Sequence, residues 1–417
     1  MNESTTIKEL STGDETFSVL EQLAREGARK MLQSALENEV AEFIEKNRSI
    51  RTAKGKQGIV RNGHMPQRSI ITGIGPLAIK QPRIDDRIFN TIEGQERFTS
   101  SILPRYMRRV PSIDNLIPFL YLKGISTGDF PNTLESILGK GASGLSATNI
   151  VRLKKSWEDD YRRWNERSMS DKEYVYIWVD GIYFNVRLES EKTCILVIIG
   201  ADKQGNKELI SITDGIRESE ISWHQQLIDL RNRGLKTAPK LAIGDGALGF
   251  WKALKKVFPE TLWQRCWVHK TANILDKLPK SVQSKAKSNI HEMYMAETKE
   301  KALMAYDKFT EIYEAKYPKA VNCLVKNKDV LFSFYDFPAE QWSHIRTTNP
   351  IESTFATVRL RTKKTKGCGS RITTLTMVYK LSIEAQKTWR KLRGYKLIPF
   401  VMKGKKFIDG ILDKMSA

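Results

Sequence analysis

The most regular pattern of hydrophobic positions lies in the middle of the chain. Residues 174–179 are six consecutive apolar or aromatic side chains, and four further apolar runs follow. Short runs rich in β-branched and aromatic residues are typical of strands buried on both faces. Two intervening stretches, 219–234 and 247–258, repeat apolar residues at helical spacing instead. The predicted strands are 174–181, 193–201, 208–213, 241–245 and 261–265.

The order of these elements predicts an α/β fold. Three strands that form an antiparallel meander are followed by helix, strand, helix and strand, which is the order of the ribonuclease H-like fold. In that fold the first and fourth strands are neighbours. Asp180 and Asp245 end these two strands, so we expect the two carboxylates to lie together.

The N-terminal part has three different patterns. Residues 17–46 show helical spacing with an acidic opposite face, and this helix packs either against its own domain or against a second subunit. Residues 47–68 are basic and rich in glycine, which predicts a loop or arm that either contacts phosphates or is simply solvated. Residues 69–83 alternate around two glycines and predict a small β-hairpin.

Residues 112–164 predict three helices, the last two joined by a glycine-containing turn. Such a pair is what a DNA-binding helix-turn-helix requires, although similar pairs are common in proteins that never bind DNA. Residues near the start of the last helix would reach base edges, and two lysines would contact phosphates. The candidates are Thr148, Asn149 and Arg152 for bases, and Lys154 and Lys155 for phosphates.

After residue 270 the strand pattern stops. Residues 270–345 are polar, Lys-rich and helical in pattern, which predicts a helical insertion because so long a loop is rare in a compact domain. A helix should then start with Asn349 as N-cap and Pro350 as its first residue. Its basic residues continue along the helix from an acid in the first turn, and a second basic helix is predicted at 373–393. The acid is Glu352, and the basic residues are Arg359, Arg361, Lys363, Lys364 and Lys366.

Three carboxylates therefore stand in contexts that suit one site: Asp180 and Asp245 at strand ends and Glu352 on a later helix. Two Mg²⁺ or Mn²⁺ ions held by such oxygen ligands would support phosphoryl transfer. Each Asp-Gly pair has a simpler explanation, because Asp-Gly is the commonest hairpin dipeptide. Glu352 also has one, because an acid in a first helical turn stabilises the helix without any metal.

Charge and composition favour a nucleic-acid partner. Lys and Arg number 69 against 48 Asp and Glu, a net charge of +21. The excess is concentrated at residues 353–417, which hold sixteen basic and three acidic side chains, whereas residues 1–50 hold six and ten. The four cysteines form no disulfide framework. The longest strongly apolar run, 194–201, is too short to span a bilayer, so no membrane contact is expected.

Four motifs, in this order, resemble those of the Mutator-like transposases of bacterial insertion sequences. They are residues 179–183, 243–246, 264–269 and 342–352. The resemblance implies a ribonuclease H-like catalytic domain, divalent metal, and DNA cutting and joining at element ends. It also implies an Asp-Asp-Glu triad, which falls on Asp180, Asp245 and Glu352. The family often has Gly-x-Phe-Pro where residues 367–370 of this chain are Gly-Cys-Gly-Ser. The resemblance therefore does not predict the backbone conformation of these four residues.

Cys266 and His269 belong to the third motif. One cysteine and one histidine are half a zinc site at most, and no second pair with suitable spacing accompanies them. We interpret them as structural support or as contacts beside the site.

The sequence therefore predicts an insertion-sequence transposase that acts on double-stranded DNA as a homodimer or higher oligomer, in the cytoplasm and at the nucleoid. A recombinase with a Ser or Tyr nucleophile, and a DNA-binding regulator with an inactive catalytic fold, are the alternatives. The predicted segments are a helical segment at 1–46, a basic arm and hairpin at 47–111, a helix-turn-helix region at 112–170, the catalytic core at 171–269 and 346–393, its insertion at 270–345, and a basic tail at 394–417.

Overall fold

The computed structural model divides the chain into two compact units, residues 1–153 and 154–417. None of the helices in the part that it describes is both long enough and apolar enough to cross a membrane. The described residues are 19–91, 97–113, 116, 120, 125, 129–139, 147–185, 193–215, 217–246, 248–364 and 370–413.

The first unit is built on one long helix, α2 (Val19–Lys46). Two small antiparallel sheets pack against it, with Leu36 and Val40 buried in the contact. The predicted hairpin is confirmed by the pairing of its two strands, but the preceding arm also contains a strand, β1, which the sequence did not predict. All five residues of β1 are exposed, so pairing with β4 rather than its own apolar residues keeps it extended. The strands are β1 (Val60–His64), β2 (Arg68–Thr72), β3 (Gly75–Ile79) and β4 (Pro82–Asp85), and the short 3-10 helix η2 (Arg87–Thr91) follows.

The helix α2 thus packs against its own unit, one of the two arrangements that the sequence left open. Its other side still exposes Leu20, Leu23 and Met31. Self-association through this side stays a prediction.

Two of the three helices predicted for residues 112–164 are described, and both are apolar on one side. They are α4 (Phe130–Leu138) and α5 (Ala147–Asn165). The helix α4 begins after Asp129, later than predicted, with proline in its first turn. The predicted turn at 139–144, apart from Gly139, and most of the first helix lie outside the described residues, so the helix-turn-helix geometry stays a prediction.

The second unit contains a five-stranded mixed sheet in the order β7-β6-β5-β8-β9. The first three strands are antiparallel, whereas β8 and β9 run parallel to β5. The predicted pairing of the first and fourth strands is therefore confirmed. The strands are β5 (Tyr174–Phe184), β6 (Thr193–Asp202), β7 (Lys207–Gly215), β8 (Leu241–Gly244) and β9 (Leu262–Arg265).

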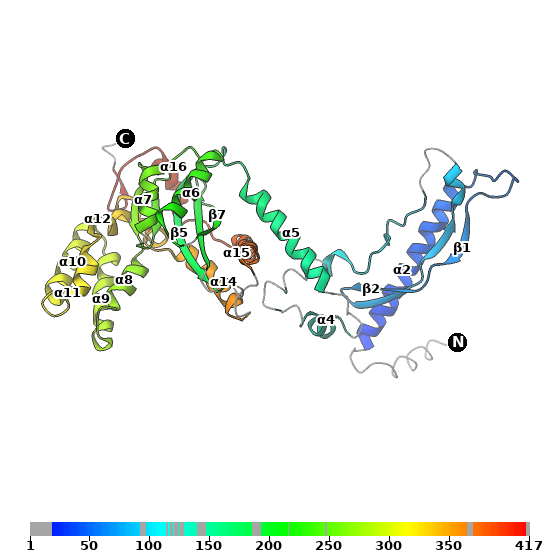
Figure 1. Cartoon of the computed structure of the whole chain (residues 1–417), viewed down its shortest axis with the longest axis horizontal. Helices are drawn as coiled ribbons and strands as arrows, with labels where there is room; N and C mark the ends of the chain where they lie inside the picture. The colour runs from blue at the N-terminus through cyan, green and yellow to red at the C-terminus, as the bar shows by residue number, and fades with distance from the viewer. Residues whose placement is uncertain are drawn as a thin grey trace. The chain divides into compact units, whose positions relative to one another are not determined.

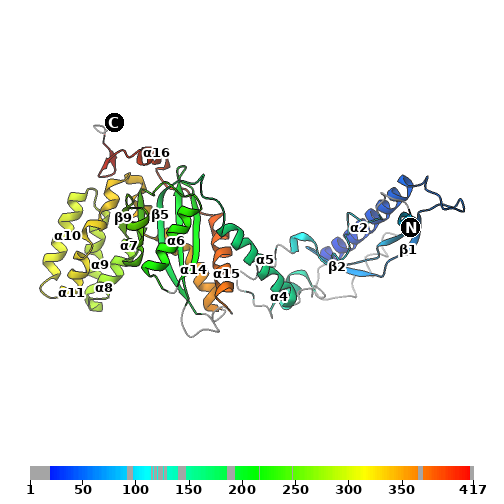
Figure 2. The ribbon, with the colours of Figure 1, turned by 45° about the horizontal axis from the view of Figure 1, so that its top comes forward.

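Helices cover both faces of this sheet (Figures 1 and 2). On one face α6 (Glu220–Asn232) and α7 (Leu248–Val257) bury Trp223 and Phe250 against β5, β6 and β7. Residues from the other side of β5 meet the segment before α14: Tyr176 contacts Phe337, and the Trp178 Nε1 donates to the His344 carbonyl at 2.9 Å. The helices α14 (Asn349–Lys364) and α15 (Arg371–Gln386) contact β5 and β7 respectively. The helix α15 ends seven residues before the predicted end at 393.

The predicted helical insertion between β9 and α14 is confirmed, although its first helix starts three residues early. Its entry and exit are adjacent, because the Trp267 amide donates to the Arg346 carbonyl at 3.0 Å. Its helices are α8 (Trp267–Leu275), α9 (Lys280–Met295), α10 (Lys299–Tyr313), α11 (Pro318–Val325), α12 (Lys328–Leu331), η3 (Ser333–Asp336), η4 (Ala339–Gln341) and α13 (Trp342–Ile345). After α14 and α15 the described residues form η5 (Tyr395–Leu397), α16 (Ile398–Met402) and a hairpin of β10 (Phe407–Ile408) and β11 (Ile411–Leu412).

Candidate active site

Asp180 and Asp245 lie beside each other in the central sheet, at the end of β8. Asp245 directly follows β8 as predicted, but Asp180 does not end its strand, because β5 continues to Phe184 through its pairing with β6. In the parallel pair of β5 and β8, Val179 is in register with Gly244, so the next residue on each strand is an aspartate. The pKa of Asp180 is raised to about 6, mainly by burial and also by the Asp245 charge, although the neighbouring His269 and Arg359 lower it. The two carboxylates therefore interact through space, as the strand order predicted.

Neither Asp-Gly pair forms a hairpin turn, so that alternative is wrong at both positions. Gly181 lies inside β5 opposite Leu196, and Gly246 lies between β8 and α7. Each glycine makes room for a neighbour: a Cβ at Gly181 would overlap the Glu218 side chain, and a Cβ at Gly246 would overlap the Arg265 guanidinium. The glycines are therefore explained by packing around the carboxylates.

Glu352 lies in the first turn of α14 and accepts a hydrogen bond from the Thr348 hydroxyl at 2.9 Å. The amides of Ile351 and Glu352 both donate to the Thr348 carbonyl, at 2.9 and 3.1 Å. The helix thus starts at Asn349, one residue earlier than the prediction with Asn349 as N-cap. A glutamate three residues after an N-cap can accept a hydrogen bond from the N–H of the cap residue, here Asn349. In the structure the Glu352 carboxylate accepts from the Thr348 hydroxyl instead.

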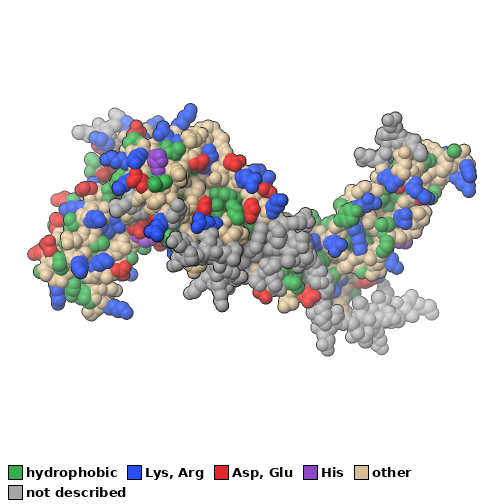
Figure 3. Space-filling model, in the orientation of Figure 1, with side chains coloured by type: hydrophobic (Ala, Val, Ile, Leu, Met, Phe, Trp, Pro, Cys, Tyr) green, Lys and Arg blue, Asp and Glu red, His purple; other side chains and the backbone are tan. Residues whose placement is uncertain are grey.

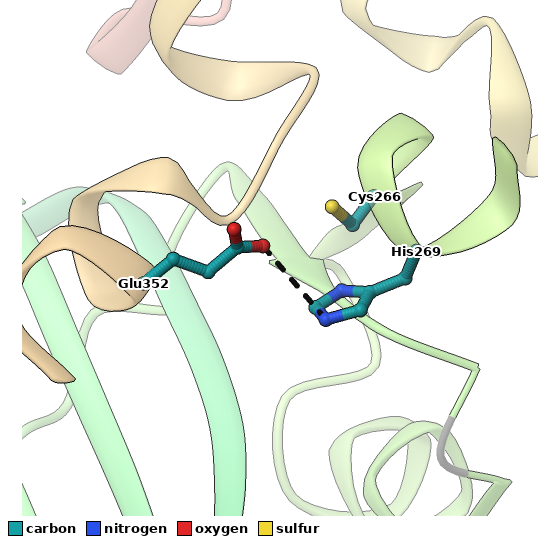
Figure 4. A group of neighbouring side chains, drawn as sticks. All are labelled: Cys266, His269 and Glu352. Carbon is teal, nitrogen blue, oxygen red and sulfur yellow. Dashed lines mark ion pairs between the residues drawn. The ribbon is translucent and has the colours of Figure 1, made fainter. Parts of the chain in front are cut away.

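Cys266, His269 and Glu352 lie close together (Figure 4), and all three are near the Thr348 hydroxyl. The Thr348 Oγ1 is 3.2 Å from the Cys266 Sγ and 3.4 Å from the His269 Nδ1. The His269 Nε2 is 3.8 Å from the Glu352 Oε1, an ion pair when the imidazole is charged. Cys266, and then Asp245 and Asp180, raise the pKa of His269 to about 9 although burial lowers it.

Cys266 connects the end of β8, which precedes Asp245, with the start of α14, which carries Glu352. Its amide donates to the carbonyl of Gly244, directly before Asp245, at 2.8 Å. Its sulfur accepts from the Thr348 amide at 3.3 Å, directly before α14. One buried residue therefore fixes the end of β8 relative to the start of the helix that carries Glu352.

An open cavity of about 320 Å³ adjoins Asp245. The sequence had assigned no role to two of the charged residues around it, Glu218 and Arg265. The Arg265 Nη2 is 3.7 Å from the Asp245 Oδ1, and its Nη1 donates to Asn327 at 2.7 Å. No motif in the sequence points to Glu218; only the folded chain brings it here. The cavity is lined by Glu218, Asp245, Gly246, Arg265 and Asn273.

Most of the predicted DNA-contacting side chains lie outside what the structure describes. The backbone of α5 contains Thr148, Asn149, Arg152 and Lys154 without described side chains, and Lys155 is exposed. In α14 the same holds for Arg361, Lys363 and Lys364, and Lys366 lies outside the described residues. Arg359 is exposed and near enough to Asp180 to lower its pKa. The structure thus connects only Arg359 with the acidic site.

The first unit has a separate groove of about 860 Å³ beside β4. Arg68 is fixed in it by donating to the Leu103 carbonyl at 3.3 Å, whereas Arg83 and Arg105 are exposed. Lys and Arg side chains are also spread over the described surface of each unit (Figure 3). The arginines that line the groove are Arg68, Arg83, Arg87, Arg97 and Arg105.

These features define a mixed α/β protein whose central sheet ends in a group of carboxylates. The sequence model described as "Transposase, Mutator family" matches residues 1–391, so the chain belongs to the Mutator family of transposases. Transposases of this family act on DNA.

Individual proteins with similar sequences are also transposases of insertion sequences. The transposase for insertion sequence element IS6120 of Mycolicibacterium smegmatis is 53% identical over 300 residues, which cover 72% of this chain and 92% of the relative. The transposase for IST2 of Acidithiobacillus ferrooxidans is 50% identical over 278 residues, 67% of this chain and 94% of the relative. The transposase for IS256 in transposon Tn4001 of Staphylococcus aureus is 27% identical over 352 residues, which cover 83% of this chain and 86% of the relative.

Proposed function

We propose that this transposase binds the ends of its insertion sequence and catalyses metal-dependent strand cleavage and strand transfer with Asp180, Asp245 and Glu352. The observation that carries the proposal is the register of β5 and β8, which aligns Val179 with Gly244 and so brings the two aspartates to one edge. The strand order β7-β6-β5-β8-β9 agrees with a ribonuclease H-like catalytic domain.

The residues at this edge fit a divalent cation such as Mg²⁺ or Mn²⁺. Carboxylate oxygens are the hard ligands that these ions prefer. The raised pKa of Asp180 reflects burial beside another acid, a cost that a bound cation would offset. A pair of such ions supplies charge stabilisation to the entering and leaving oxygens of an in-line phosphoryl transfer.

The chain's own residues would then orient rather than attack. Asp180 and Asp245 hold the cations, and Thr348 and His269 fix the Glu352 carboxylate through the contacts at 2.9 and 3.8 Å. Arg359, exposed on the same helix as Glu352, suits a phosphate of the DNA backbone. No side chain forms a covalent bond to DNA, which separates this mechanism from that of a Ser or Tyr recombinase.

The test is cleavage of labelled end DNA by the full chain with Asp180→Asn, Asp245→Asn or Glu352→Gln. Each variant should fold and bind end DNA but lose cleavage and joining by orders of magnitude, because amides are poor Mg²⁺ ligands. Asp276→Asn, an exposed acid of the insertion, is the matched control and should cleave normally.

Full cleavage by a triad variant, or by the wild type in excess EDTA, would contradict the proposal. A covalent protein–DNA adduct would favour a recombinase with a protein nucleophile. End binding without cleavage under any metal would favour the inactive regulator.

A further inference from the structure

Glu218 occupies the connection between β7 and α6, directly before the helix N-cap Ser219. The backbone of this connection is pressed against α7, because a Cβ at Gly249 would lie 2.5 Å from the Glu218 carbonyl oxygen. The glycine therefore lets the connection approach the helix closely. This contact fixes where the Glu218 side chain starts.

The side chain of Glu218 lies over the strand that carries Asp180. Its Cγ and carboxylate occupy the space that a side chain at Gly181 would need. The same carboxylate lines the cavity next to Asp245. Glu218 therefore lies near both aspartates while coming from a third element.

The surroundings of Glu218 are unfavourable for an anion in the protein alone. Among the described residues, its charged neighbours are the carboxylates of Asp180 and Asp245 and, more weakly, the imidazole of His269. Its hydrogen-bonding neighbour is Tyr183, so a purely structural role would act through that phenol.

We propose that Glu218 is a fourth acidic residue of the active site and binds the divalent cations together with Asp180 and Asp245. The inference rests on the proposed function, because it assigns Glu218 to the same cation site. It extends that function because the fourth carboxylate comes from the start of α6, outside the three positions of the triad.

The test measures Mn²⁺ binding to the full chain by calorimetry, without DNA and without turnover. Glu218→Gln should weaken the affinity for at least one ion by about tenfold or more, since even residues that only orient a ligand have effects of that size. Glu220→Gln is the matched control: it removes an acid two residues away that is paired with Lys256 at 2.6 Å outside the site. Glu220→Gln and Tyr183→Phe should both bind Mn²⁺ like the wild type.

Thermal unfolding gives a second readout that does not depend on activity. Without metal, Glu218→Gln should melt at or above the wild-type temperature, because it removes one of several repelling anions. With Mn²⁺ it should gain less stability than the wild type, since bound cations stabilise the folded state according to their affinity. Glu218→Asp keeps the charge on a shorter side chain and should give intermediate Mn²⁺ affinity.

The outcomes separate this inference from the proposal on which it rests. If Glu218→Gln binds Mn²⁺ like the wild type while Asp180→Asn and Asp245→Asn bind it weakly, the role of Glu218 is refuted and the triad stands. An effect of Tyr183→Phe equal to that of Glu218→Gln would also refute it in favour of the structural role. If none of the acidic variants changes Mn²⁺ binding, the proposed cation site itself is wrong.

Discussion

Thr348 is fully buried, and its hydroxyl contacts Cys266, His269 and Glu352. Thr348→Val keeps the shape of the side chain but removes the group that orients the Glu352 carboxylate. We expect it to lower the free energy of unfolding by only about 1 kcal/mol and to reduce strand cleavage by about 10–100-fold, the size of other losses of orienting groups. Urea unfolding and single-turnover cleavage measure the two effects.

Two variants control for this prediction. Thr348→Ser restores the hydroxyl and should recover most of the cleavage rate. Thr354→Val removes a buried hydroxyl from the same helix, where it donates to the Pro350 carbonyl at 3.2 Å, and should leave cleavage unchanged. Equal cleavage by Thr348→Val and wild type would show that Glu352 needs no support from this cluster.

His344 gives a prediction about stability and pH. Burial, together with Lys207 and Arg393, lowers its pKa from 6.5 to about 4, and its Nε2 accepts from the Arg393 amide at 3.3 Å. Between pH 4 and 6.5 the unfolded chain therefore binds more protons at this residue, so stability should rise with pH across this window and be complete above 6.5. In His344→Gln the slope of unfolding free energy against pH should be shallower. An unchanged slope would assign the pH dependence to other groups.

At the scale of elements, Gln264 of β9 joins the sheet to the insertion. Its amide nitrogen donates to the Leu331 carbonyl, and its oxygen accepts from the Phe334 amide, both at 2.9 Å. Gln264→Leu leaves the buried Phe334 amide without this partner, whereas the Leu331 carbonyl keeps the Trp267 Nε1 as a donor at 2.8 Å. We therefore expect a loss of about 1–3 kcal/mol of unfolding free energy, measured by urea unfolding. Gln283→Leu, which also removes bonds to two carbonyls but at a partly buried position, should cost less.

The elements that the sequence predicted well are those whose pattern is local. The five strands of the second unit were found to within three residues at either end, because each is a short apolar run with turn residues beside it. The strand β1 was missed because it has an arginine, an asparagine, a glycine and a histidine in five residues and depends on β4 for its shape.

The candidate site was predictable in its outline and not in its details. The order of elements sufficed to bring Asp180 to Asp245. Glu218 was not predicted, because its position depends on how closely Gly249 and Gly181 let other segments approach. Such approaches are set by packing between elements far apart in sequence, and no local pattern contains them.

At the scale of the whole molecule, the net charge of +21 predicts DNA binding that weakens steeply with salt. In the first unit, the exposed Arg83 and Arg105 of the basic groove are candidates for phosphate contacts. The double variant Arg83→Ala, Arg105→Ala should reduce the slope of log affinity against log salt by up to about 2 and weaken end DNA and random DNA alike. Binding titrations at several salt concentrations measure both.

The control for this prediction removes two basic residues of the same unit that are already paired. Lys30 lies 3.8 Å from Glu26, and Arg48 lies 3.2 Å from Glu45, both on exposed surface. Alanine at these two positions should leave the salt slope nearly unchanged. If both double variants act equally, the groove has no special part in binding.

The adjacent ends of the insertion have a consequence for recognising distant relatives. Because the Trp267 amide meets the Arg346 carbonyl, the chain leaves the sheet and returns at almost the same point. Residues could be gained or lost within the insertion while Asp245 and Glu352 keep their positions relative to each other. The interval between the second and third acids is therefore a poor criterion for membership. A search for distant relatives should let the length of that interval vary freely. It should require instead the residues that meet at the two ends of the insertion, Cys266 and Thr348.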